Sequence, residues 1–448
     1  MEYHAVCNVV RREKEKRGDL ATIEDIIAKR SHHLLGNDGT DILVFGQSNA
    51  VPHLSLTALI QADGTFKCVV PPYKQLYVFH GVLHNNVSFP LLYCLVKGKD
   101  QSLYERLLHL VEQIAAARRS TIFNRPVEVM TDFEQAFIAA MRQYRAGSHI
   151  VCCFFHFVSS LRKRLQPLVN QLARTERENA GITRLAEATK CALMMLPLLP
   201  RELITMGLVN AVIGRCTAAF GHTETDFKAV REYIEATYVG AGARFPVRLW
   251  SVSGRNVRTN NAAESSHARL NAHLHARKAV SVNQFLGVIE TEMHNVSKEI
   301  RSGCQSHSKA IFSMRDDLLG AELEQLFLGG QSVLKFLDHC ASVTQLDNEE
   351  HVWAFVERRR KEEPDESDKA WIAANRARVV DAAVGLHRRL LPGSQMSVQT
   401  IMSTIRSWTF MDVPCIILDD VADENSELSL VVDEPRESFL EIVREMDN

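Results

Sequence analysis

Three acidic residues lie at positions where carboxylates could share a metal ion. Asp63 is in "QADGTFKCV" at the entry to a strand-like run, Asp132 ends the apolar run "VEVMTD", and Glu264 is in "TNNAAESSH" beside a helical stretch. Two divalent ions about 3.5–4 Å apart can activate an attacking oxygen and stabilise a leaving oxygen in phosphodiester displacement. Mg²⁺ prefers carboxylate oxygen. The three acids are therefore the candidate catalytic residues and ligands of Mg²⁺ or Mn²⁺.

Each acid also has a purely structural interpretation. Asp63 is followed by glycine, and Asp-Gly is a strong signal for a hairpin turn. Asp132 suits a helix N-cap, with Gln135 at the capping-box position. Glu264 comes three residues after Asn261 and could be the acid of another capping box. Taken singly each signal is weak, and only their order on successive elements favours a shared site.

Cys153 and His156 in "CCFFHF" form a Cys-x-x-His pair at a predicted strand–helix junction. This spacing suits metal chelation, but only two ligands are visible and zinc is not indicated. Cys304 and His307 have the same spacing, which shows how often the pattern occurs by chance. A buried thiol and a hydrogen-bonded histidine are the alternative.

Basic side chains occur in two groups that could bind DNA phosphates and so position the backbone without reading bases. The candidate DNA-binding residues are Arg162, Lys163, Arg164, Arg255, Arg258 and Arg269. The last three flank Glu264 on both sides. A solvated surface is the alternative for any one of them. Trp250 in "FPVRLWSV" could stack on a base, although a core position is the simpler interpretation.

Composition limits the classes of function. The formal net charge is −2, so any nucleic-acid surface must be a local basic patch. The ten cysteines show no small-domain framework and fit a reducing compartment. The N-terminus has no signal-peptide core, and the apolar runs are too short to span a bilayer. The phosphate-binding, dinucleotide-binding, zinc-protease and serine-hydrolase motifs are all missing. A soluble nuclear or cytosolic protein is expected, with no membrane partner.

The order of elements predicts an α/β fold. β-Branched and aromatic runs indicate strands near 54–60, 64–70, 75–82 and 88–96, followed by a helix at about 101–118. "VEVMTD" and "HIVCCFF" then read as buried strands separated and followed by helices. An antiparallel meander followed by alternating helix and strand is the RNase H-like pattern, a mixed sheet with three meandering strands plus parallel additions.

The 448 residues exceed what one compact core usually holds, so several parts are expected. The predicted parts are an N-terminal helical segment (1–50), the first part of the RNase H-like core (51–165), a helical insertion (166–245), a core completion carrying the third acid (246–300), a helical C-terminal region (301–415) and an acidic tail (416–448).

Five stretches, taken together and in order, resemble the Mutator-like element (MULE) transposases of eukaryotes. They are "ADGTFKCVVPPYKQLYVFHGV", "SFPLLYCLVKGKDQSLYERLL", "VEVMTDFEQAFIAAM", "CCFFHF" and "LWSVSGRNVRTNNAAESSHARLN". The resemblance runs from about residue 55 to residue 290. It implies an RNase H-like DDE enzyme with a helical insertion between the second and third acids.

The resemblance implies a role for each matched residue. Asp63 falls in the D-G-T-F segment, Asp132 in the T-D-F-E segment and Glu264 in the T-N-N-x-x-E-S segment, which makes them the catalytic triad and the ligands of two Mg²⁺ or Mn²⁺ ions. Cys153 and His156 fall on the family's Cys-x-x-His and become supporting residues. The implied activity is cleavage at element ends and strand transfer by the freed 3′ hydroxyl, on nuclear DNA. The family allows a homodimer.

One feature departs from the family pattern. Many relatives carry an N-terminal zinc-binding DNA module, and no Cys/His quartet precedes residue 55 here. We therefore expect either that end recognition lies elsewhere or that the reading frame is truncated. The alternative function is a domesticated or defective transposase-derived protein that binds DNA or protein partners without catalysis.

Overall fold

The computed structural model describes residues 32–404 except for 48, 68, 84–85, 126, 146–148, 176–179, 221–223, 275–279, 303–309 and 392–395. Residues in this range group by their contacts into two compact units. The first unit takes its residues from 1–150 and 260–306, and the second from 151–259 and 307–448. The acidic tail predicted at 416–448 and the Cys304–His307 pair lie outside the described residues.

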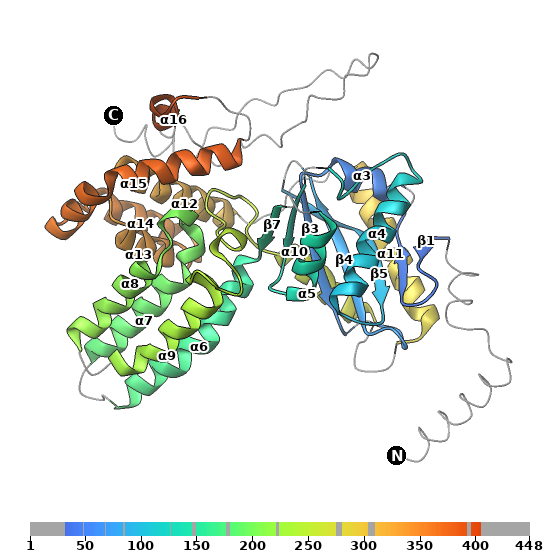
Figure 1. Cartoon of the computed structure of the whole chain (residues 1–448), viewed down its shortest axis with the longest axis horizontal. Helices are drawn as coiled ribbons and strands as arrows, with labels where there is room; N and C mark the ends of the chain where they lie inside the picture. The colour runs from blue at the N-terminus through green and yellow to red at the C-terminus, as the bar shows by residue number, and fades with distance from the viewer. Residues whose placement is uncertain are drawn as a thin grey trace. The chain divides into compact units, whose positions relative to one another are not determined.

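The first unit is built on a mixed sheet of seven described strands, with order β1-β2-β5-β4-β3-β6-β7 (Figure 1). The strands are β1 (Leu34–Asn37), β2 (Ile42–Phe45), β3 (Leu59–Thr65), β4 (Gln75–Val82), β5 (Ser88–Val96), β6 (Glu128–Thr131) and β7 (His149–Cys152). β3, β4 and β5 form an antiparallel meander, and β6 pairs with β3 in parallel. β7 runs across the boundary between the units.

Helices cover both faces of this sheet, and the burial of β4 along its whole length agrees with this arrangement. Every residue of "QLYVFHGV" is buried, which is typical of a strand with both faces covered. Tyr77 and Phe79 pack with Tyr104 and Phe137, whose ring centroids lie 5.2 and 5.1 Å from that of Tyr77. Those partners belong to α4 (Gln101–Ala116) and α5 (Gln135–Tyr144). α3 (Ala50–Leu56) packs against β4 and β5.

The alternate residues of β4, Leu76 and Val78, face a second apolar cluster. This cluster brings in Leu270 and Phe285 from α10 (Asn261–His273) and α11 (Val282–Arg301). Burying one side chain of this size stabilises the fold by about 1.5–3 kcal/mol. The cluster therefore holds α10, which carries Glu264, against the sheet.

The second unit is helical over its described residues. Its helices are α6 (Phe154–Thr175), α7 (Ala180–Met194), α8 (Met206–Ala219), α9 (Glu224–Ile234), α12 (Ala310–Leu328), α13 (Val333–Val343), α14 (Glu349–Arg360), α15 (Glu366–Leu390) and α16 (Val398–Thr404), with the short helices η1 (Leu196–Leu198), η2 (Arg201–Leu203), η4 (Glu235–Val239) and η5 (Val247–Leu249) (Figure 1). Trp250 is fully buried, stacks on Phe157 at 4.7 Å and donates to Phe245 O at 2.9 Å. The core interpretation of Trp250 is confirmed, and base stacking by it is excluded.

The structure corrects several predicted elements. The strand predicted at 54–60 is wrong in part, since these residues include the end of α3. The spacing of apolar residues in "HLSLTALI" fits a helix as well as a strand, because the stretch is so short. The strand expected at 64–70 is β3, shifted toward the N-terminus. The helical segment expected at 1–50 is wrong where it is described, since residues 34–45 carry β1 and β2. Its residues 1–31 lie outside the described range.

Candidate active site at the carboxyl ends of two strands

Asp63 lies within a strand and not in a hairpin turn. In β3 it pairs with Val78 of β4, and the next residue, Gly64, pairs with Tyr77. A Cβ at Gly64 would overlap the Gln75 side chain and come within 3.0 Å of Tyr77 Cδ2. The glycine is therefore required by close packing between β3 and β4, and the turn interpretation of Asp-Gly is wrong.

Asp132 continues the register that joins β6 to β3. The pairs Leu59–Glu128, Ile60–Val129 and Gln61–Met130 are each 69 positions apart, and so are Asp63 and Asp132. Asp132 directly follows the last residue of β6. Neighbouring strands lie about 4.8 Å apart. The first two acids therefore occupy level positions at the carboxyl ends of adjacent parallel strands.

The Asp63 carboxylate is nearly buried and has two defined partners. Its Oδ1 accepts from Gly64 N at 2.9 Å, and its Oδ2 lies 3.3 Å from His267 Nδ1. The side chains of Asp63 and His267 are 11% and 8% exposed. The pKa of His80, which is fully buried, is lowered to about 3, first by burial and then by electrostatic interaction with His267 and Arg269. His80 is therefore neutral.

Glu264 lies on the same helix as His267. α10 packs against β3, and residues three apart on a helix are neighbours on one face, so Glu264 is one turn from the Asp63–His267 contact. The capping-box interpretation is wrong, because the N-cap is Asn260, which makes no side-chain cap hydrogen bond. Glu264 is instead the fourth residue of the helix.

Asp132 is not the N-cap of α5. The N-cap lies two residues later, at Glu134, and the helix begins at Gln135. Asp132 Oδ1 accepts from Glu134 N at 3.0 Å. The pKa of Glu134 is raised to about 7, first by burial and then by the charge of Asp132, with a smaller contribution from Asp63. Tyr104 Oη donates to Glu134 Oε2 at 3.0 Å. Both strand acids therefore lie within electrostatic reach of a third carboxyl group.

Sequence reasoning missed Glu134 and His267 as members of this cluster. Glu134 lies two residues after Asp132, and its place in "TDFEQ" is a local signal for a second acid near the end of β6. His267 follows Glu264 by three residues, a spacing that predicts one helix face. Its contact with Asp63, more than two hundred residues earlier, has no local signal.

The residue types and their placement fit a divalent cation. Carboxylate oxygen is the preferred donor for Mg²⁺. Burial and then repulsion by Asp132 raise the pKa of Glu134, and a cation would offset that repulsion. Across the described residues, no three His, Cys, Asp or Glu side chains converge on a single ion position. The Asp63 and Asp132 side chains are instead turned to His267 and to the backbone of Glu134.

Cys153 and His156 belong to the second unit. Cys153 directly follows β7 and is fully buried, and its carbonyl oxygen accepts from Phe157 N in the first turn of α6 at 3.2 Å. The ring of His156 lies 5.7 Å from that of Phe155, which is 46% exposed. The Cys-x-x-His pair thus marks the start of α6.

The six predicted DNA-binding residues differ in their surroundings. Arg162, Lys163 and Arg164 are exposed on α6, where Arg164 lies over the Tyr233 ring at 4.7 Å. Arg258 forms an ion pair with Asp316 and donates to the carbonyl oxygen of Arg255 at 3.1 Å. Arg269, 54% exposed, lies 3.5 Å from Glu292. The guanidinium of Arg258 is therefore engaged within the second unit.

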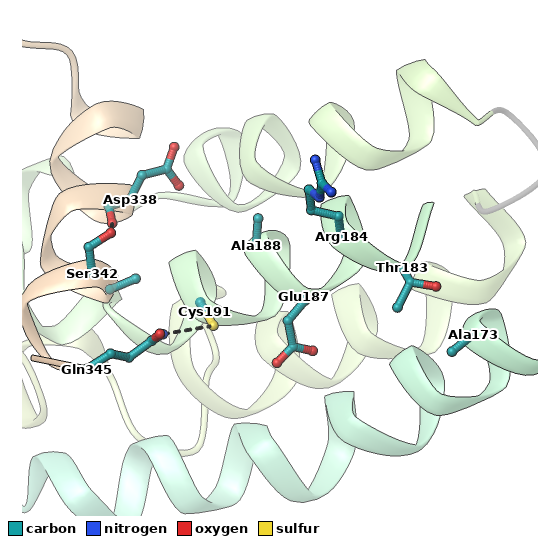
Figure 2. Close-up of a pocket in the computed structure, with 10 residues that line it drawn as sticks. Ala173, Thr183, Arg184, Glu187, Ala188, Cys191, Asp338, Ser342 and Gln345 are labelled. Atoms are coloured by element: carbon teal, nitrogen blue, oxygen red, sulfur yellow. Dashed lines mark hydrogen bonds between the residues drawn. The ribbon is translucent and has the colours of Figure 1, made fainter. Parts of the chain in front are cut away.

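The second unit also contains a cavity of about 710 Å³ between α6, α7 and α13 (Figure 2). Two of its acidic lining residues have partners, since Asp338 pairs with Arg215 at 2.6 Å and Glu187 pairs with Lys190. Gln345 Nε2 lies 3.9 Å from Cys191 Sγ, and burial raises the pKa of that thiol. The cavity shares no residue with the acid cluster.

Comparison with known proteins agrees with the geometry. No curated protein sequence matches this chain. Within the described ranges, no helix combines the length and apolar character needed to cross a membrane. Residues 59–160, which include Asp63, Asp132 and the Cys-x-x-His pair, match the family model of the MULE transposase domain. Residues 59–160 are therefore similar to a MULE transposase domain, and over these residues the resemblance seen in the sequence is confirmed.

Proposed function

We propose that this protein is a metal-dependent DNA transposase that cleaves and joins strands with Asp63, Asp132 and Glu264. The observation that carries the proposal is the parallel pairing of β3 with β6, because continuing its register by two residues brings Asp63 level with Asp132. The packing of α10, the helix that carries Glu264, against β3 supports including Glu264. The MULE domain match supports a transposase-type function and DNA as the partner.

The finer fold assignment belongs to this proposal. The order β5-β4-β3-β6-β7 is a meander followed by strands added beyond its first member. This is the order expected of an RNase H-like core, in which acids of the first and fourth strands are neighbours. β1 and β2 extend the sheet at the opposite edge.

The three acids and His267 have different roles in the proposed reaction. Asp63, Asp132 and Glu264 would hold two Mg²⁺ or Mn²⁺ ions, which when bound activate the attacking oxygen and stabilise the leaving oxygen. His267 holds the Asp63 carboxylate in place. Water attacks phosphorus at the element end, and the 3′ oxygen leaves as a hydroxyl, which then attacks target DNA. The DNA substrate places the protein in the nucleus.

A nicking assay tests the proposal. The substrate is a supercoiled plasmid carrying the genomic sequences that flank this gene, incubated with purified protein and Mg²⁺ or Mn²⁺. We expect Asp63→Asn and Asp132→Asn each to slow nicking at least about a hundredfold, because an amide is a poor Mg²⁺ ligand. Glu128→Gln is the matched control, since Glu128 lies at the other end of β6.

Two outcomes would reject the proposal. Equal nicking by the wild type and both Asp variants would show that the acids are not catalytic. DNA binding without nicking by any of the proteins would favour the alternative function, a transposase-derived protein that binds DNA without catalysis.

A further inference from the structure

Exposed side chains that the function has not yet used gather at one end of the sheet. Thr65 of β3 pairs with Leu76 of β4, and Gln75 pairs with Val96 of β5, so β3 ends, β4 begins and β5 ends at the same level. Four exposed residues around these strand ends, Phe66, Lys67, Lys74 and Lys99, are here called the sheet-end patch. Pro71, Pro72 and Asp100, the N-cap of α4, are exposed there as well. Asp63 lies at this end of β3.

Phe66 is the unusual member of the sheet-end patch. Its side chain is 58% exposed, although it directly follows a central strand, and the Lys99 amine lies 5.8 Å from its ring centroid. A neighbouring pair shows the contrast, since Tyr73 under Lys97 is buried and the Lys97 amine donates to Thr40 O at 2.5 Å. The Lys97–Tyr73 pair is structural, whereas Phe66 and Lys99 face solvent.

The sheet-end patch adjoins the acid cluster. Phe66 is three residues after Asp63, and three residues span at most about 11 Å. The Lys99 amine lies 5.8 Å from the Phe66 ring centroid, so it lies at the same end of β3 as Asp63. All these residues belong to the first unit.

The chemistry of the sheet-end patch selects one kind of ligand. Lysine amines bind phosphates through charge, and an exposed aromatic ring offers a platform on which a base can stack whatever its sequence. Bases inside a duplex have both ring faces covered, so a side chain can stack only on an unpaired nucleotide.

We propose that the sheet-end patch binds an unpaired nucleotide of the DNA strand beside the cleaved bond, with its base stacked on Phe66 and neighbouring phosphates on Lys67, Lys74 and Lys99. This inference rests on the proposed function, which supplies the DNA substrate. It assigns the site a preference for a locally melted strand, independent of base identity.

Binding to single-stranded DNA tests the inference without requiring cleavage. All proteins carry Asp63→Asn so that no strand is cut, and the probe is a fluorescein-labelled oligothymidine of about 12 nucleotides. In anisotropy titrations, Phe66→Ala should weaken binding about five- to hundredfold, and Phe66→Trp should restore it. Phe312→Ala is the matched control, because Phe312 is 50% exposed with Arg315 at 5.6 Å but lies in the other unit. We expect the control to bind like the parent.

Two further measurements separate stacking from charge. Replacing Lys67, Lys74 or Lys99 by Ala should each reduce the slope of log affinity against log salt by about 0.7, whereas Phe66→Ala should leave the slope unchanged. On an abasic oligonucleotide of the same length, the difference between Phe66→Ala and the parent should vanish.

The inference is overturned if Phe66→Ala binds like the parent, if it loses no more affinity than Phe312→Ala, or if its loss persists on the abasic strand. Melting curves of the Phe66 variants, which should match the parent, exclude misfolding as the cause. Failure of the proposed function is distinguishable, because stacking on Phe66 by a protein that never nicks DNA would reject catalysis alone. If the protein nicks DNA but its affinity for the oligonucleotide is unchanged by Phe66→Ala, this inference alone is rejected.

Discussion

At the scale of single residues, the cluster concentrates negative charge in a partly buried place. Asp63 and Asp132 are level on adjacent strands, and the carboxyl group of Glu134 lies within reach of both. Proteins rarely keep such groups together for stability, since like charges disfavour ionisation of their neighbours. The arrangement therefore supports the proposal of a bound cation.

Glu264 offers a direct test of function against structure. Because it lies in the first turn of α10, its charge favours the helix by about 0.3–1 kcal/mol. Glu264→Gln should lower the free energy of unfolding by no more than this, yet slow plasmid nicking at least about a hundredfold, since a neutral amide is a poor Mg²⁺ ligand. Urea unfolding and the nicking assay measure the two effects. Ser265→Ala, an exposed neighbour, should change neither. A stable variant that nicks at the wild-type rate would leave Glu264 a structural residue only.

Glu134 predicts a pH dependence of stability in metal-free buffer. Its pKa is raised to about 7 in the fold, mainly by burial and Asp132, from an ordinary value of 4.5. The folded state therefore holds a proton that the unfolded chain loses first, so this stabilising contribution is present below about pH 4.5 and is lost as pH rises through about 7. We expect that, with EDTA present, the free energy of unfolding of the wild type falls relative to that of Glu134→Gln as pH rises across this range. Glu366→Gln, whose side chain is 91% exposed, should give a constant difference. A constant difference for Glu134→Gln would show that its pKa is not raised.

At the scale of elements, long regular segments followed from the sequence and contacts between segments did not. The apolar runs of β4 and β5 and the periodicity of α4 were predicted nearly to the residue. The predicted start of α5 is two residues early, because Asp132 is a favoured N-cap residue whereas Glu134, which stands at the cap, makes no side-chain cap hydrogen bond. The Asp63-Gly64 pair predicts a hairpin turn from local sequence alone. The glycine is explained instead by a tertiary contact, its close packing against the Gln75 side chain.

The second unit holds three of its helices together through one buried acid. Glu322 of α12 accepts a hydrogen bond at its Oε1 from Arg359 Nε of α14 at 2.8 Å. Its Oε2 lies 3.1 Å from His339 Nδ1 of α13. Burial alone would raise the pKa of Glu322, but these two partners lower it to about 2. Its contribution to stability is therefore present above about pH 4.5 and is lost as pH falls toward 2.

Removing this acid should be costly. Glu322→Ala leaves Arg359 and His339 without their buried partner, so we expect the free energy of unfolding to fall by about 3–5 kcal/mol. Glu357→Ala, which breaks the exposed pair with Arg360 on the same helix as Arg359, should cost less than about 1 kcal/mol. Chemical denaturation at neutral pH measures both. Equal costs for the two variants would mean that the buried network does not hold α12, α13 and α14 together.

At the scale of the whole molecule, the division into two units separates the acids from the helical part. Asp63, Asp132 and Glu264 all belong to the first unit, although Glu264 is contributed by a segment that returns after residue 259. The family match covers 59–160 and so includes only the first two acids. The third is joined to them by the packing of α10 against β3, which no local sequence signal predicts.

This division predicts where a metal ion acts. A ligand that binds only the folded state stabilises it by about 2.7 kcal/mol at one hundred times its dissociation constant. Hydrogen–deuterium exchange with and without Mn²⁺ should therefore show slower exchange in β3, β6 and the start of α10, and no change in α12, α13 or α14. The Asp63→Asn, Asp132→Asn double variant should lose this protection, because it removes two of the ligands, while Glu128→Gln should keep it. Protection spread evenly over both units, or kept by the double variant, would place the metal elsewhere and reject the three acids as its ligands.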